Sequence, residues 1–161
     1  MARNDKKGDE EGIKPIARNR RAFHEYHILD KIECAIVLTG TEVKSLREGS
    51  CNLEDAYARI EEGEVWLLGS DIPEYSMGNR LNHKPKRKRK LLLHRREIGK
   101  FAGKASQRGF TLVPLRMYFK DGRAKVELAV AKGKHLHDKR EAARKADAQR
   151  DIQRAMNSRR R

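Results

Sequence analysis

The sequence has few cysteines, few aromatic residues and no long hydrophobic run. Its two cysteines, Cys34 and Cys51, are too few for a disulfide scaffold and form no CxxC motif or Cys/His cluster, which indicates a reducing compartment. No apolar run approaches the roughly 18 residues that a membrane helix needs, and the start of the chain shows no signal-peptide core. We therefore expect a soluble, cytoplasmic protein with no membrane partner.

The patterns on which catalysis usually depends are also lacking. There is no GxGxxG or GxxxxGK[ST] loop, and no carboxylate cluster of the kind that a nuclease needs. His24 and His27 come closest to a metal-binding pair, but residues three apart on a strand point to opposite faces, and no third ligand lies nearby. The two cysteines are typical of small buried hydrophobic side chains. We predict a protein that is not an enzyme and that holds no metal or cofactor.

Positive charge, by contrast, is abundant and unevenly placed. The chain has 38 Lys and Arg against 23 Asp and Glu, a net charge of +15. Residues 80–104 hold 11 basic residues and one acidic, and residues 132–161 hold 11 and four, whereas residues 13–79 hold eight and 12. Scattered lysines would suffice for solubility, so this unevenness favours a surface that meets a nucleic acid.

The densest basic run predicts the phosphate contacts. It spans Lys84–Lys90 and continues through Arg95, Arg96, Lys100 and Lys104. Phosphate contacts carry little sequence information, so selectivity needs other groups. The candidates are Asn19, His24, Tyr26, Glu33 and the segment Leu91–His94. Because only 6% of the residues are aromatic, shape recognition of folded RNA is favoured over stacking on successive bases.

Alternating apolar positions predict a mainly β domain over residues 13–131. The clearest hairpin is Phe110–Val130, with Asp121 and Gly122 as its turn, and Pro114 places its strand at an edge or at a bulge. Ala56–Ser70 predicts a second hairpin, and Tyr26–Leu38 predicts one or two strands interrupted near Asp30.

Two helices are expected between these strands. The first covers Glu42–Glu48, with Thr41 as its N-cap and Gly49 after its last turn, and the second lies within Leu93–Ser106. Several short antiparallel strands with two inserted helices indicate a small closed or nearly closed barrel.

The two ends of the chain differ from this domain. Residues 1–12 are polar and charged, which predicts a disordered lead-in. Residues 132–161 contain strong helix formers but almost no apolar stripe, apart from a face with Ile152 and Met156. We predict a basic tail that is disordered in the free protein and helical against a partner. A spacer with no ordered state is the open alternative.

Six ordered motifs carry a resemblance to a known family. They are Ile16–Ala22, Gly40–Arg47, Asn82–His83, Arg89–His94, Gly109–Leu115 and Gly133–Arg140. In this order they resemble the SsrA-binding protein family, also called small protein B, in register from about Ile13 to Arg161. The resemblance implies a six-stranded antiparallel OB-like barrel with flanking α-helices and a basic C-terminal tail.

The resemblance also implies a function. The barrel would bind the tRNA-like domain of transfer-messenger RNA, and the tail would enter the small-subunit decoding centre of a stalled ribosome. Elongation factor Tu and alanyl-tRNA synthetase are implied as indirect partners. The alternative function is a general RNA-binding or ribosome-associated protein with an OB fold.

The expected site residues form two groups. The RNA-binding group is Asn19, Arg20, Arg21, Glu33, Lys84, Lys86, Arg87, Lys88, Arg89, Lys90, Leu93 and His94. The decoding-centre group in the tail is Gly133, His137, Asp138, Lys139, Arg140, Ile152 and Met156. The chain departs from the family pattern at Cys34-Ala35, where Ala-Gly is usual, and at His135, where lysine is common.

Overall fold

The computed structural model describes residues 12–49 and 51–158. The lead-in predicted over residues 1–12 therefore lies outside the described residues except for Gly12. Seven strands and four helices follow one another along the described chain. They are β1 (Ile13–Arg18), α1 (Arg20–Glu25), β2 (Tyr26–Ile36), α2 (Gly40–Arg47), β3 (Tyr57–Glu61), β4 (Glu64–Leu68), β5 (Arg89–Leu92), α3 (Arg95–Ala105), β6 (Phe110–Lys120), β7 (Arg123–Gly133) and α4 (Leu136–Ser158). Among the described helices, none is both long and apolar enough to cross a membrane.

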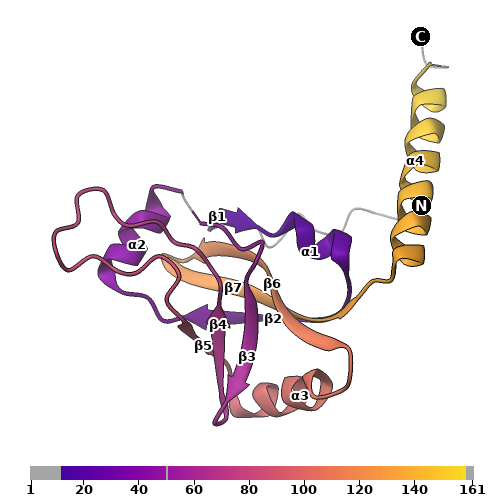
Figure 1. The fold of residues 1–161 in the computed structure, drawn as a ribbon. Coiled ribbons are helices and arrows are strands. Elements are labelled where there is room, and N and C mark those ends of the chain that lie inside the picture. The colour runs from indigo at the N-terminus through magenta and orange to yellow at the C-terminus, as the bar shows by residue number, and fades with distance from the viewer. Residues whose placement is uncertain (1–11, 50, 159–161) are drawn as a thin grey trace.

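Six of the strands close into an antiparallel barrel. The order is β6, β3, β4, β5, β2 and β7, and β7 pairs back onto β6 (Figure 1). The seam between β3 and β6 is narrow, with Ala58 opposite Leu112 as its one registered pair. The seventh strand, β1, pairs with the second half of β6 and is not part of the ring. The predicted mainly β, antiparallel fold with flanking helices is confirmed, and β1 is a strand beyond the six that were expected.

Apolar side chains fill the barrel and its outer face. Leu67, Val126 and Leu128 point into a core that Leu46 of α2 and Phe101 of α3 also join. A second cluster forms on the outside, where Ala22 of α1 packs on Val113, Leu115, Ala129 and Ala131 of the β6–β7 hairpin. This second cluster fixes α1 against the sheet and brings the end of β1 close to β6 and β7.

The predicted hairpins are confirmed. Asp121 and Gly122 both have positive φ, 51° and 75°, as a two-residue hairpin turn requires. The register of β6 shifts between Pro114 and Arg116, so the proline sits at a bulge because it cannot donate a ladder hydrogen bond. The interruption expected near Asp30 is a register shift between Ile28 and Asp30 within one continuous strand.

The predicted start of the first helix is wrong by two residues. α2 begins at Gly40, and its N-cap is Thr39 rather than Thr41. The backbone N–H of Thr39 donates to the Glu42 carboxylate at 2.9 Å, which satisfies one of the free donors at the helix start. Gly49 has a φ of 92° just after the helix, as expected.

The tail is a helix that stands away from the barrel, at the end opposite the long loop between β4 and β5 (Figure 1). None of its described side chains is buried, so packing against the barrel does not stabilise it. The helix over Leu136–Ser158 differs from the disorder that the sequence predicts for the free tail, and disorder in solution stays a prediction. The last barrel strand ends at Gly133, two residues beyond the expected boundary at residue 131.

Candidate nucleic-acid interface

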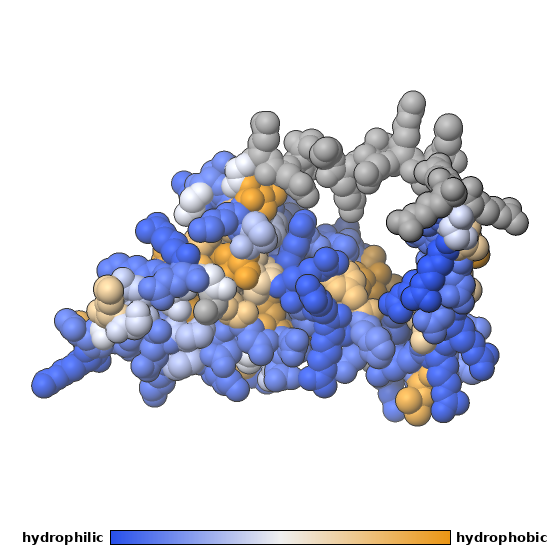
Figure 2. Space-filling view, turned by 90° about the horizontal axis from the view of Figure 1, so that it is seen from above, coloured by the Kyte–Doolittle hydropathy of each residue, from blue (hydrophilic) through white to orange (hydrophobic). Residues whose placement is uncertain are grey.

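An open groove of about 800 Å³ runs along the outside of the barrel between β1, α1 and the β2–β7–β6 sheet. Phe23 of α1 lies at its wall, with the Arg18 guanidinium 5.4 Å and the Lys31 ammonium 5.7 Å from the ring centroid. In the view from above, hydrophilic residues cover most of the surface, with hydrophobic patches between them (Figure 2). An aromatic wall flanked by two cations suits a phosphate-bearing ligand with flat bases.

Glu33 lies in this groove as an oriented hydrogen-bond acceptor. Its carboxylate accepts a hydrogen bond from the Tyr118 hydroxyl and lies 3.5 Å from the Lys120 ammonium. The Tyr118 hydrogen bond and the Lys120 charge outweigh desolvation and lower the pKa of Glu33. Because 37% of the Glu33 side chain stays exposed, an ionised acceptor faces the groove.

The other acid of the groove is more fully paired. Glu127 is 14% exposed, and its carboxylate lies 2.6 Å from Arg116 and 3.5 Å from Lys31. Glu33 and Glu127 sit opposite each other in the register of β2 and β7. Of this neighbouring pair, Glu33 is the carboxylate with free surface to offer a ligand.

The basic run divides into inward arginines and outward lysines. Lys84, Lys86 and Lys88 are exposed, whereas Arg89 is completely buried and Arg87 is 31% exposed. The prediction that Arg89 contacts RNA is corrected, because a guanidinium without solvent access cannot reach a phosphate. Arg87 is also occupied, since its Nε and Nη2 each donate to the Glu42 carboxylate at 2.6 Å.

Acids on the protein also pair with part of the lysine row. Lys88 lies 3.5 Å from Glu61 and 4.7 Å from the centroid of the Trp66 ring, and Lys90 donates to Glu64. Within the described residues, Lys84 and Lys86 have no acidic partner. These two lysines are therefore the cations of the run that are most open to a polyanion.

Asn19 does not present its side chain to solvent. It is 2% exposed, donates to the carbonyls of Leu53 and Pro114 at 3.0 and 3.1 Å, and accepts from the Ala22 N–H as the N-cap of α1. The prediction of direct RNA contact by this side chain is corrected, because its amide group already donates hydrogen bonds to two carbonyls inside the protein. Asn19 instead fixes the start of α1 against the barrel.

The remaining residues of the predicted RNA group occupy different environments. Arg20 and His24 are exposed on α1, while Arg21 pairs with Glu25 at 2.8 Å and with Asp55 at 3.2 Å. Tyr26 packs against the cluster under α1. The structure thus brings Arg20, Arg21 and His24 to one short helix.

Leu93 and His94 form the entry to α3. Leu93 is half-buried against the core, whereas its neighbour Leu92 is 50% exposed. His94 is exposed as the N-cap of α3, and its backbone N–H donates to Glu97 at 2.9 Å. Leu92 was missed as a surface residue because three consecutive leucines give no signal for which one faces out.

The base of the tail is anchored to the barrel near α1. Gly133 pairs with Tyr26 at the end of β7, and the N–H of Lys134 donates to the Glu25 carbonyl at 2.8 Å. Asp138 accepts from the His135 N–H at 3.2 Å and lies 3.5 Å from the His27 imidazole. The His135 hydrogen bond and then His27 lower the pKa of Asp138. The sequence did not indicate this contact between His27 and Asp138, because the two residues are 111 positions apart.

The other predicted tail residues point to solvent. His137 and Arg140 are exposed and Lys139 is half-buried in the first turns of α4, and Ile152 and Met156 are 57% and 65% exposed near its end. Because these two apolar side chains lie one turn apart, they form one small hydrophobic face. Within the described chain, no group of His, Cys, Asp and Glu is arranged to hold a metal ion.

Comparisons with known proteins agree on one family. The family model described as "SmpB protein" matches residues 16–158. The SsrA-binding protein of Thermobifida fusca is 54% identical over 160 residues, 99% of this chain and 100% of that protein. That of Carboxydothermus hydrogenoformans is 56% identical over 91% of this chain and 98% of that protein. A solved structure described as "tmRNA-SmpB: a journey to the center of the bacterial ribosome" is 48% identical, with a TM-score of 0.66 over 81% of this chain and 95% of that chain.

Proposed function

The chain belongs to the SmpB protein family, and we propose that it binds transfer-messenger RNA and delivers it to stalled ribosomes for trans-translation. The observation that carries the proposal is the full-length match to an SsrA-binding protein, 54% identical over 99% of this chain. At this identity and coverage both the barrel and the tail are shared with the relative.

The groove supports recognition that goes beyond charge. A protein that only neutralised phosphates would gain nothing from an exposed carboxylate, because an acid repels the RNA backbone. Glu33 can instead accept hydrogen bonds from exocyclic amines or 2′-hydroxyls of folded RNA. We propose that Glu33 reads the tRNA-like domain, that Arg20, Arg21 and His94 also contact this RNA, and that Lys84, Lys86 and Lys88 contact its phosphates.

The tail supports a second contact. Its group of Gly133, His137, Asp138, Lys139, Arg140, Ile152 and Met156 starts at the barrel and ends in an exposed basic helix. We propose that it enters the decoding centre of the small ribosomal subunit. Elongation factor Tu and alanyl-tRNA synthetase, as indirect partners, stay predictions. The proposed role is binding in the cytoplasm, without catalysis.

Competition binding tests the proposal. The tRNA-like half of transfer-messenger RNA competes against ordinary tRNA and against an unstructured RNA of equal length, at one near-physiological salt concentration. We expect a preference of about a hundredfold, which corresponds to roughly 2.7 kcal/mol. Equal binding to all three RNAs would contradict the proposal and favour a general RNA-binding OB protein.

A further inference from the structure

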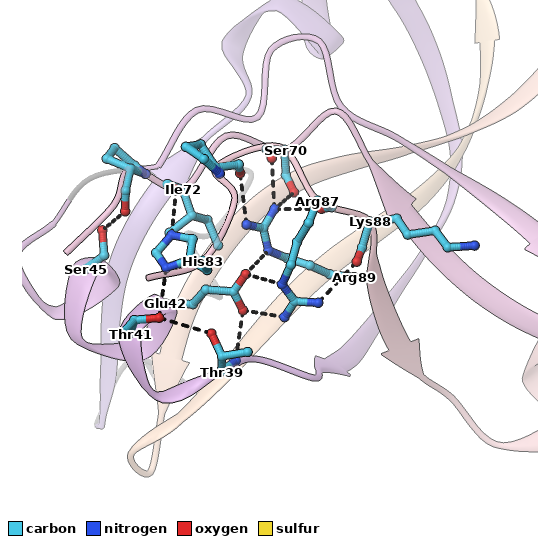
Figure 3. Close-up of polar contacts among 12 residues, drawn as sticks. Thr39, Thr41, Glu42, Ser45, Ser70, Ile72, His83, Arg87, Lys88 and Arg89 are labelled. Atoms are coloured by element: carbon cyan, nitrogen blue, oxygen red, sulfur yellow. Dashed lines mark hydrogen bonds and ion pairs between the residues drawn. The ribbon is translucent and has the colours of Figure 1, made fainter. Parts of the chain in front are cut away.

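A buried acid lies beneath the most basic segment of the protein. Glu42 of α2 is completely buried, and both of its carboxylate oxygens accept hydrogen bonds (Figure 3). One oxygen accepts from Arg87 Nε at 2.6 Å and from Arg89 Nε at 2.9 Å. The other accepts from Arg87 Nη2 at 2.6 Å and from the Thr39 N–H at 2.9 Å. A single carboxylate therefore holds both arginines of the run.

Arg89 extends this connection to the rest of the segment. Its Nη1 donates to the Ser70 carbonyl at 2.9 Å and to the Ser70 hydroxyl at 3.0 Å, and its Nη2 donates to the Pro85 carbonyl at 2.9 Å (Figure 3). The Pro85 carbonyl also accepts from the Ile72 N–H at 3.1 Å. The buried guanidinium thus ties α2, the end of β4 and the turn before β5 into one unit.

The direction of the lysines follows from this arrangement. The N–H of Arg87 donates to the Lys84 carbonyl at 3.2 Å, which closes a turn with Pro85 at its second position. Because Arg87 and Arg89 turn inward to Glu42, Lys84 and Lys86 remain on the outside. His83 fixes the same turn from its other end, through Thr41 at 3.0 Å and the Ile72 carbonyl at 2.9 Å.

We propose that Glu42 is a positioning residue for RNA binding: it holds Arg87 and Arg89 so that Lys84 and Lys86 form a preset pair of phosphate contacts. The inference rests on the proposed RNA-binding function. Pre-ordering this turn removes most of the entropy that a flexible loop would lose when its lysines engage phosphates. The acid acts through the arginines and never touches the RNA.

In the test, losing a negative charge should tighten RNA binding, whereas losing the positioning of the lysines should weaken it. Glu42→Gln removes one negative charge, and so does the matched control Glu64→Gln, whose carboxylate is 43% exposed and pairs with Lys90. If charge alone matters, both variants bind structured RNA more tightly. If Glu42 positions the lysines, Glu42→Gln weakens binding by about tenfold, and the slope of log affinity against log salt shrinks by roughly two phosphate contacts. Tighter or unchanged binding by folded Glu42→Gln overturns the proposal.

A second set of variants tests the pathway of the effect. In the parent protein, the double change Lys84→Ala/Lys86→Ala should weaken RNA binding by a similar factor. It should also reduce the slope of log affinity against log salt by the same amount. The same pair of changes in the Glu42→Gln background should add little, because the preset contact is already lost. Full additivity would mean that Glu42 supports only the fold.

Glu42→Asp covers the case in which Glu42→Gln fails to fold. It keeps the charge but is one methylene shorter, so it cannot meet both guanidiniums as glutamate does. Weaker RNA binding and a smaller salt slope support positioning, and unchanged values overturn it. All of these comparisons can use ordinary tRNA. A protein with no preference for the tRNA-like half would contradict the proposed function and still allow the positioning effect to be measured.

Discussion

Arg89 Nε lies 2.9 Å from a carboxylate oxygen of Glu42, and neither side chain is exposed to solvent. Burying two charges costs several kcal/mol of desolvation, which their attraction offsets only when the remaining donors and acceptors are also satisfied. Here Ser70, Pro85, Arg87 and Thr39 supply those partners. The stability of the barrel next to the basic turn therefore depends on the pair staying intact.

Breaking the pair from the arginine side should destabilise the protein strongly. Arg89→Met leaves Glu42 buried with only part of its compensation, and we expect the free energy of unfolding to fall by about 3–5 kcal/mol. Urea denaturation at neutral pH measures the change. Arg95→Met, at an exposed position of α3, is the control and should change stability by less than about 0.5 kcal/mol. Equal effects of the two variants would contradict the structural role of Arg89.

Acid should weaken the same region. Burial acts to raise the pKa of Glu42, but hydrogen bonds from Arg87 and Thr39 and the charges of both arginines outweigh it, so the net pKa is lowered. A depressed folded-state pKa contributes stability above the unfolded-state value of 4.5, and this contribution disappears as the pH falls through the folded-state value. Between pH 7 and 3 the urea midpoint of the parent should fall more steeply than that of Glu42→Gln. Parallel curves would show that Glu42 does not drive the acid response.

The hydrogen bond between Tyr118 and Glu33 predicts a graded loss of RNA selectivity. Glu33→Gln should reduce the preference for the tRNA-like RNA by about tenfold, because the amide nitrogen donates where the carboxylate accepts. Tyr118→Phe keeps the acid but frees its rotamer, so its loss should be smaller. Glu62→Gln, exposed in the turn of the β3–β4 hairpin, is the charge-matched control and should leave the preference unchanged. Unchanged selectivity in Glu33→Gln would remove this residue from recognition.

Removing the tail should separate RNA binding from ribosome rescue. Cutting after Ala131 would remove Lys132 and Gly133, which pair with β6 and β2, so the chain should end at Lys134 instead. We expect this truncation to retain most affinity for the tRNA-like RNA and to abolish rescue in a reconstituted translation assay. A loss of affinity as large as the loss of rescue would mean that the tail only supplies charge.

The two thiols should react slowly in the native protein. Burial raises the pKa of Cys34 and of Cys51 to about 12, so almost no thiolate is present at pH 8. A chromogenic disulfide reagent should label both at the free-cysteine rate only after urea is added. Rapid labelling of one thiol in the folded protein would place that cysteine in a more open environment.

Local sequence was sufficient to predict the structural features that depend only on neighbouring residues, such as turns. Asp121-Gly122 between two alternating runs predicts a hairpin because few other residues tolerate two positive φ angles. Pro114 predicts an edge or a bulge for an equally local reason, its missing N–H, and the structure has the bulge. The N-cap of α2 was misplaced because Thr39 and Thr41 are both good caps, and only the reach of Glu42 back to the Thr39 N–H favours the first.

The candidate site was only partly predictable, because its geometry depends on residues that are distant in sequence. The excess charge of residues 80–104 and the family motifs both indicated an RNA-binding surface. Glu33, which the family resemblance indicated, has an exposed side chain, as an RNA contact requires. The burial of Arg89 and Asn19 could not be predicted. The sequence around a basic or amide side chain in a polar run does not indicate whether that side chain faces solvent or the protein interior.

Composition, charge distribution and alternation along the chain were enough to indicate a basic, mainly β, nucleic-acid-binding protein with a separate tail, because each of these properties belongs to residues near one another in sequence. Which of the cations are free was settled only by folding, which brings Glu42 to Arg87 and Arg89 across more than 40 residues. Burial and pairing depend on such distant partners, so the division between the inward arginines and the outward lysines is a property of the tertiary structure.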